Sequence, residues 1–401
     1  MNLEMLKMKK NYLRRILDVS LNNRHYSTVV FQASFCLDEI KDIIEELKDE
    51  YHIDNVIFID FDNEKVKSFY NSNPTEKEIE RFIPKFPKPI GNMKIIYFNN
   101  AITDFSNNYN SDYSVKYYKH LKEYNKEVFD RIKNLSSSDE TVTVCPNKEW
   151  AEGLLGSQEQ LDELWMKISK TLLSHNEAKK EIEKRIEQKK ELNRMGIRKL
   201  CFYTDLGTDF RISLNSHSIW VCEPNDTEGI FNFFNFPSYE IYTSPNCYSA
   251  EGKIVLSKKS RFYYDTVVEN AIFEFSKGRL ISSKSNSELF DSIVLNKPNK
   301  MNRIGEIALV SQSSPLAKSG EYYDSVILDE NTGCHFALGY SFDKCIGVEK
   351  AKLKEKGARY YRYNTSKYHT DLVFGDDSIS VEAETKCKKK VLLMEKGIWK
   401  I

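Results

Sequence analysis

Residues 27–59 read STVVFQASFCLDEIKDIIEELKDEYHIDNVIFI, and the fold class of the first half of the chain follows from this stretch. β-branched and aromatic runs at 29–31 and 56–59 flank a segment with apolar residues at helical spacing, namely Ile40, Ile43, Ile44 and Leu47. A strand, a helix and a second strand in this order are typical of a mostly parallel sheet.

The alternation continues to about residue 173. Further strand-like runs lie at 95–98 and 142–145, and apolar residues recur at helical spacing over 113–132 and 157–173. The sequence therefore predicts an N-terminal α/β domain built on a mostly parallel sheet.

The segment 176–199 is rich in Glu and Lys at i,i+4 spacings, which predicts a solvated helix. We take this helix as the end of an N-terminal domain over 1–199 and as the bridge to the next domain. From residue 200 the chain changes to short extended runs divided by turn residues, such as 200–204, 211–214, 253–256 and 391–394. We predict a β-rich, antiparallel domain over 200–401, so the whole chain is of the α+β or α/β class.

Composition excludes several classes of protein. The 401 residues include 59 Lys and Arg against 59 Asp and Glu, so no global field favours nucleic acid, and Glu cancels the basic charge of 176–199. The longest apolar runs fall far short of the ~18 residues of a membrane span. Residues 1–10 lack the apolar core of a signal peptide, and the eight cysteines form no C-x-x-C pair. We expect a cytoplasmic protein with neither nucleic-acid nor membrane partners.

Nucleotide-binding and serine-hydrolase motifs are missing: the sequence contains no G-x-x-x-x-G-K-[ST], no G-x-S-x-G, no H-E-x-x-H and no G-x-G-x-x-G after a strand. Carboxylates and imidazoles instead gather in the second half. Residues 329–339 read DENTGCHFALG, and His369 and Asp371 lie two apart in an extended segment, where both project from one face. Such a set suits a divalent-metal site. The alternative is that each histidine is an ordinary surface or core residue.

Read together, five segments resemble the family of metal-dependent aminopeptidases that includes the thermophilic aminopeptidases T and S. In chain order they are GTD at 207–209, NFPSYEIYTSP at 235–245, GEIALV at 305–310, DENTGCHFALG at 329–339 and SKYHTD at 366–371. The resemblance is specific between residues 200 and 399 and is limited to a general pattern before that.

The resemblance implies six metal ligands, which are Glu240, Glu306, Glu330, His335, His369 and Asp371. Six ligands suit two divalent ions bridged by a carboxylate, for which we choose Glu306. Zinc or cobalt is the expected metal, and manganese is also compatible with this ligand set. Taken alone, Glu306 would equally suit a helix cap, and Glu330 with Asn331 a turn.

The sequence departs from the family at two positions. The family usually has a tyrosine seven residues after the histidine that corresponds to His335, whereas this chain has Phe342, with Tyr340 two residues earlier. A phenylalanine cannot donate a phenolic hydrogen bond. Tyr239 stands where the family often has the first of two glutamates, and the aligned ligand Glu240 is retained.

By resemblance we expect a homodimeric metallo-aminopeptidase that releases N-terminal amino acids from short peptides. Metal-activated water would attack the peptide bond, and Glu306 or Glu330 would carry the proton to the leaving amine. Two alternatives stay open. One is a metal- and peptide-binding homologue that Phe342 has weakened catalytically, and the other is a different metal-dependent hydrolase on the same scaffold.

Overall fold

The computed structural model describes residues 3–22, 24–99, 112–172, 175–227, 230–262, 266–296 and 300–401. The chain divides into two compact units, one of Met1–Leu172 with Pro224–Pro237 and the other of Leu173–Glu223 with Ser238–Ile401. The charged helix groups with the second unit. The domain limits 1–199 and 200–401 stay a prediction.

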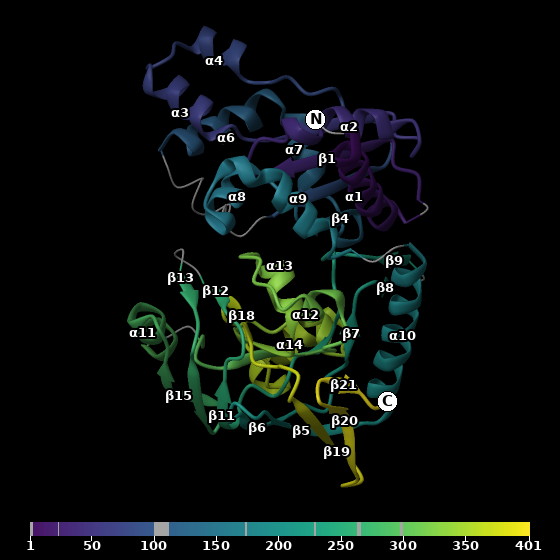
Figure 1. The fold of residues 1–401 in the computed structure, drawn as a ribbon, viewed down its shortest axis with the longest axis vertical. Helices are drawn as coiled ribbons and strands as arrows, with labels where there is room; N and C mark the ends of the chain where they lie inside the picture. The colour runs from purple at the N-terminus through teal and green to yellow at the C-terminus, as the bar shows by residue number, and fades with distance from the viewer. Residues whose placement is uncertain are drawn as a thin grey trace. The chain divides into compact units, whose positions relative to one another are not determined.

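The first unit alternates helices and strands along the chain (Figure 1). In order, its elements are α1 Leu3–Leu21, β1 Thr28–Ala33, α2 Asp38–Lys48, β2 Asn55–Ile59, α3 Asn63–Asn71, α4 Glu76–Phe82, β3 Met93–Phe98, α6 Asp112–Tyr124, α7 Lys126–Lys133, η2 Ser137–Asp139, β4 Glu140–Thr143, α8 Lys148–Leu155, η3 Gln158–Gln160, α9 Leu161–Ser169, β8 Asn225–Thr227 and β9 Ile230–Asn232.

A four-stranded parallel sheet in the order β2-β1-β3-β4 forms the centre of this unit. Val29 and Val30 point to opposite faces of β1, and both are fully buried. Val30 belongs to an apolar cluster with Tyr117 and Leu121 of α6, so helices cover that face. Burial of both faces explains the continuous apolar strands in the sequence. The parallel sheet of the first half is confirmed.

Two predicted elements differ in extent. The helix predicted over 113–132 is broken at Asn125, whose side-chain amide donates to the carbonyls of Leu121 and Pro84, while its oxygen accepts from the Phe86 amide. These bonds anchor the loop before β3. The helix is therefore interrupted, and α6 and α7 form in its place. The strand predicted at 142–145 is β4, which ends at Thr143 because it pairs with β3 only as far as Phe98.

The second unit is rich in β-strands. Its elements are α10 His175–Arg194, β5 Ile197–Tyr203, β6 Asp209–Ser213, β7 Val221–Cys222, β10 Glu240–Thr243, β11 Glu251–Val255, β12 Ser260–Phe262, β13 Thr266–Val268, β14 Ile272–Ser276, β15 Arg279–Lys284, α11 Glu288–Asn296, β16 Ile304–Val310, α12 Pro315–Ser319, α13 Val326–Asp329, η4 Glu330–Thr332, β17 His335–Gly339, η5 Asp343–Cys345, α14 Lys350–Tyr361, β18 His369–Val373, β19 Ser380–Thr385, β20 Lys390–Glu395 and β21 Ile398–Trp399.

Two antiparallel sheets form the centre of this unit. One has eight strands in the order β15-β14-β11-β6-β5-β19-β20-β21, and the other has five in the order β18-β17-β16-β10-β7. Aromatic rings join them: Phe273 of β14 meets Phe336 of β17, and Phe202 of β5 meets Phe374, which follows β18. The antiparallel character predicted for the second half is confirmed.

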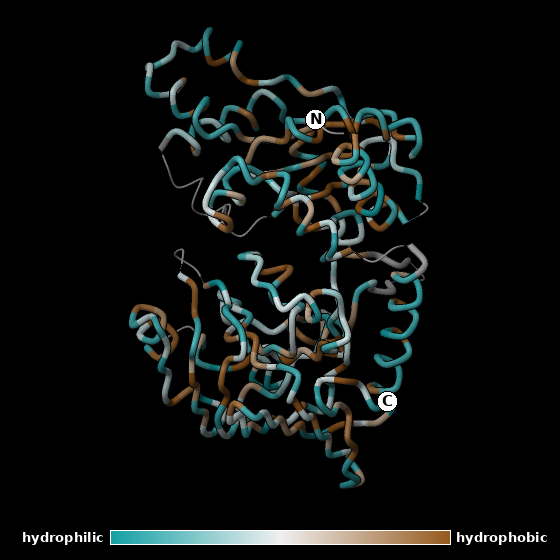
Figure 2. Tube along the Cα trace, in the orientation of Figure 1, coloured by the Kyte–Doolittle hydropathy of each residue, from teal (hydrophilic) through white to brown (hydrophobic). Residues whose placement is uncertain are grey.

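The helix α10 is hydrophilic over most of its length, as Figure 2 shows. It is nevertheless attached to the second unit. Arg185 is buried and donates to the carbonyl of Glu223, and the Asn193 side chain exchanges two hydrogen bonds with the backbone of Trp220. The helix is therefore mostly solvated, as its charge pattern predicts, and is anchored to the unit along one face.

None of the described helices combines the length and apolar character that crossing a membrane requires.

Candidate metal centre

The five-stranded sheet places polar side chains on the face turned away from the apolar core. Side chains alternate between the two faces of a strand. In β17, Phe336 and Leu338 belong to the core, so His335 points to the opposite face. By the same alternation, Ile307 of β16 and Leu372 of β18 belong to the core. Their neighbours on the other face are Glu306 in β16, Asp371 and His369 in β18, and Glu240 in β10.

Two groups of potential ligands meet on this face. Glu240, Glu306 and His335 form one group, and Glu306, His369 and Asp371 form the other. Within each group one donor atom per residue lies within 4.8 Å of the others. Glu306 belongs to both groups, which is the position that a bridging carboxylate needs. This placement excludes the helix cap that Glu306 alone would have suited, because the residue lies within a strand.

Both imidazoles are oriented by the backbone. Nδ1 of His335 lies 3.2 Å from the Gly333 carbonyl oxygen, and Nδ1 of His369 lies 3.0 Å from that of Tyr340. A carbonyl only accepts, so each Nδ1 donates and each Nε2 is directed at the carboxylates. Burial opposes charging of His335, but its contact with Glu240, 3.1 Å from Nε2, raises the imidazole pKa to about 9.

The second imidazole lies between two carboxylates. Nε2 of His369 is 3.1 Å from Glu306 and 3.2 Å from Asp371. Burial again opposes its charged form, and the charge of Asp371 and the hydrogen bonds to both acids outweigh this effect, so its pKa lies well above the usual range. Burial acts to raise the pKa of Asp371, but the positive charge of His369 acts against it, and the pKa is lowered overall. Burial raises the pKa of Glu306, with His369 acting in the opposite direction.

Glu330 lies beside these groups without joining either of them in the described part of the chain. It is buried, and burial together with the charges of Glu240, Asp371 and Glu306 raises its pKa well above the usual range. The four carboxylates of the site therefore repel one another strongly when they are ionised. With both imidazoles protonated, four ionised carboxylates would still leave two negative charges uncompensated. Hard oxygen donors, two Nε2 atoms and excess negative charge in a buried site fit divalent cations.

A short helical segment positions Glu330. The carboxylate of Asp329 accepts from the amides of Tyr323 and Ser325, both at 2.8 Å, and so holds the start of α13. Asn331 donates to the Ile327 carbonyl. The side-chain oxygen of Asn331 also accepts from the amide of Tyr239, at 2.6 Å. These bonds tie the segment that carries Glu330 to the start of β10.

Aromatic residues border the second group. The ring of Phe342 lies 4.8 Å from the His369 ring, so the residue that replaces the expected tyrosine packs directly on a candidate ligand. Tyr340 contacts Phe342 edge-on at 5.7 Å. Lys344 lies over the Phe342 ring at 5.7 Å, and its ammonium is 3.6 Å from the buried carboxylate of Glu223.

The structure brings five of the six predicted ligands into the two groups and places Glu330 beside them. The positioning roles of Asn331 and of the carbonyls of Gly333 and Tyr340 were missed. The role of Asn331 could have been suspected, because this residue follows Glu330 directly. The backbone carbonyls could not, because every residue has one and the sequence does not show which of them faces a histidine. Lys344 was also missed, since its proximity to the site depends on the turn that follows β17.

Comparisons with known proteins find named aminopeptidases among the relatives of this chain. The chain is 27% identical to the aminopeptidase PepS of Streptococcus thermophilus over 273 residues, 65% of each protein. It is 26% identical to aminopeptidase T of Thermus aquaticus over 200 residues, 49% of this chain and 47% of that one. The chain therefore spans less than two thirds of the length of these relatives.

A solved structure shares the fold. Wild-type AmpT from Thermus thermophilus superposes with a TM-score of 0.74 at 19% identity, and the match covers 99% of both chains. The model of the thermophilic metalloprotease family M29 matches residues 7–399, nearly the whole chain. The chain therefore belongs to the thermophilic metalloprotease family M29.

Proposed function

We propose that this protein is a metal-dependent aminopeptidase that removes N-terminal residues from short peptides. The observation that carries the proposal is the sharing of Glu306 by two ligand groups on one sheet face. The family and the aminopeptidases named among its relatives support the reaction class.

In this proposal, Glu240, Glu306 and His335 hold one divalent ion, and Glu306, His369 and Asp371 hold the second. Zinc or cobalt is the expected metal, with manganese a third compatible ion. When bound, such a pair of ions polarises the scissile carbonyl and lowers the pKa of water to about 7.

Proton transfer is assigned to Glu330. Glu306 has its oxygens committed to both groups, whereas Glu330 stands outside both and is buried beside them. Burial and the neighbouring acids raise its pKa, which suits a carboxyl that takes a proton and returns it to the leaving amine. The substrate's free N-terminal amine would be bound among the same carboxylates.

The direct test measures release of free amino acids from di- to pentapeptides. The protein is stripped with a chelator and then supplied with zinc, cobalt or manganese. Metal-dependent trimming from the free N-terminus is expected, and it should disappear in His369→Ala but persist in the exposed-histidine control His25→Ala. Equal cleavage of N-acetylated peptides would contradict an aminopeptidase and favour another hydrolase on this scaffold.

A catalytically weakened homologue is the second candidate function, favoured by the ring of Phe342 on His369. Such a protein would bind metal and peptides but turn over slowly. The homodimer and the cytoplasmic location expected from the sequence stay predictions, and sedimentation equilibrium tests the first of them.

A further inference from the structure

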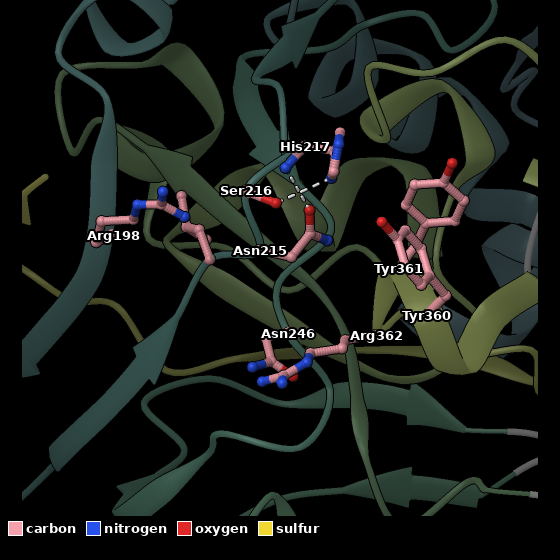
Figure 3. Close-up of a pocket in the computed structure, with 9 residues that line it drawn as sticks. Arg198, Asn215, Ser216, His217, Asn246, Tyr360, Tyr361 and Arg362 are labelled. Carbon is pink, nitrogen blue, oxygen red and sulfur yellow. Dashed lines mark hydrogen bonds between the residues drawn. The ribbon is translucent and has the colours of Figure 1, made fainter. Parts of the chain in front are cut away.

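A second polar site lies in the same unit, away from the ligand groups described above. It is a pocket of about 350 Å³ lined by residues from four separate segments. Figure 3 shows Arg198 of β5 entering from one side and Arg362, which follows α14, from another. In this view Asn215 lies between them, with His217 above it and Asn246 beside the Arg362 side chain. The volume is at the lower end of the range for small-molecule pockets.

The described residues of the lining are rich in hydrogen-bond donors and include no carboxylate. In the described part of the chain, neither Arg198 nor Arg362 forms an ion pair. An arginine in a protein remains charged at any physiological pH. Two guanidinium groups that line one cavity without an acidic partner give it a positive potential, which attracts an anion.

An orphaned donor points to the same ligand chemistry. The side-chain oxygen of Asn215 accepts from the His217 amide at 2.7 Å, which fixes the orientation of the amide group. Its Nδ2 is buried and has no hydrogen-bond partner. A buried donor without an acceptor costs free energy that a ligand oxygen would recover. Asn246 is similarly oriented, because its oxygen accepts from the Tyr248 amide.

The walls of the pocket are held by backbone bonds. The Cys247 amide donates to the Arg362 carbonyl, and the Gly347 amide donates to the His217 carbonyl at 2.7 Å. The buried ring of Tyr361 packs edge-on against His217, with centroids 5.2 Å apart. The donors are therefore presented on a framework that exists before any ligand binds, which reduces the entropic cost of binding.

We propose that this pocket binds a small phosphate-bearing molecule, with its phosphate oxygens between Arg198 and Arg362 and in reach of the Asn215 amide. Guanidinium groups bind phosphate through paired N–H donors, and two of them match a doubly charged group. The pocket uses none of the proposed metal ligands, so this site is independent of the proposed peptidase activity.

The test is calorimetric titration of the metal-loaded full chain with phenyl phosphate and with inorganic phosphate, against succinate as a dicarboxylate. Both phosphates are expected to bind, and Arg198→Gln or Arg362→Gln should weaken each at least about tenfold. Arg211→Gln is the matched control, since this exposed arginine of β6 pairs with Asp209. Affinity unchanged in both pocket variants would overturn the proposal, and so would tighter binding of succinate.

Asn215→Asp provides a second variant that keeps the shape of the side chain. Its new carboxylate would lie between the two arginines and occupy the place of the ligand charge. The variant is expected to melt no lower than the parent protein and to lose phosphate binding. Retained binding in a folded Asn215→Asp variant would contradict the site.

Discussion

Two clusters of acidic residues in the described part of the chain have the spacing of metal ligands, and they differ in which cations balance their charge. In the first unit, Cys36, Asp38 and Asp60 bring their donor atoms within 4.8 Å of one another. The Lys41 ammonium lies 2.8 Å from Asp38 and 2.7 Å from Asp60. Burial raises the pKa of the Cys36 thiol to about 11, although the hydrogen bond from the Asp38 backbone opposes the shift, so the thiol is a poor ligand.

In the candidate metal centre of the second unit, the cations that face the carboxylates are the imidazoles of His335 and His369. Unlike a lysine, each imidazole becomes a neutral ligand when a metal displaces its proton. The carboxylates of this centre outnumber its imidazoles, and burial raises the pKa of Glu306 and of Glu330. The comparison teaches that spacing alone does not identify a metal site. A partly exposed cluster that holds a lysine gains little from a metal, whereas a buried cluster whose cations are displaceable imidazole protons has more binding energy to gain.

Glu306→Gln should have the largest effect, because it removes the carboxylate charge that both groups share. We expect peptide hydrolysis to fall about 10³-fold or more and bound metal to be lost from both positions. Amino-acid release and metal analysis after dialysis measure these effects. Asp60→Asn, in the compensated cluster, is the matched control and should keep both properties; loss of metal in that control would break the comparison.

Lys94 extends the comparison to a buried cation. It is fully buried and donates to the Ser138 carbonyl at 3.3 Å, and burial lowers its pKa to about 7 although the charge of Asp139 opposes the shift. Between pH 7 and about 10.4 the unfolded chain binds this proton and the folded chain does not. Stability therefore rises with pH across that window, by up to about 1.4 kcal/mol per pH unit.

Lys94→Met removes the free-energy cost of burying this amine. We expect the variant to be more stable than the parent protein by a few kcal/mol at pH 7. The measurement is the free energy of urea unfolding at pH values from 7 to 10 for both proteins. The difference in stability should shrink as the pH rises. A constant difference would show that Lys94 is charged in the folded protein throughout.

The variant Phe342→Tyr tests whether the candidate metal centre lacks an uncharged hydrogen-bond donor. If a phenolic hydroxyl next to His369 can reach the developing oxyanion, kcat should rise about 10- to 100-fold with little change in KM. Steady-state kinetics on one dipeptide measures this. Tyr340→Phe is the control, and a rate loss there would mean that Tyr340 already supplies the hydrogen bond.

Lys41→Met should have the smallest effect. Its side chain and that of Asp38 are partly exposed, so we expect a loss of about 1 kcal/mol in the free energy of unfolding and no change in peptidase rate. Removal of the internal cation should also make the Asp38–Asp60 pair a weak zinc site, detectable by calorimetry. No gain in zinc binding would contradict the charge-balance argument.

Much of this site could be predicted because strand periodicity is local. His369 and Asp371 are two residues apart in β18 and therefore project from the same face. In β17, His335 projects toward the site and its neighbour Phe336 toward the core. The break at Asn125 was not predictable, since it depends on a distant loop at Pro84. The order of the eight-stranded sheet and the arginine pocket likewise depend on which distant segments meet, and no local pattern records that.

The candidate ligands begin at Glu240 and end at Asp371, on neighbouring strands of one sheet, and β11 to β15 separate β10 from β16 in the chain. During synthesis, no partial chain that stops before residue 371 has both ligand groups complete. The first group, which ends at His335, is complete earlier, so no metal ion could be held by a full ligand group before residue 335 is made. In the proposed centre, both ions could be held only after β18 has been made, so the cell's supply of free metal would act on a sheet whose other strands already exist.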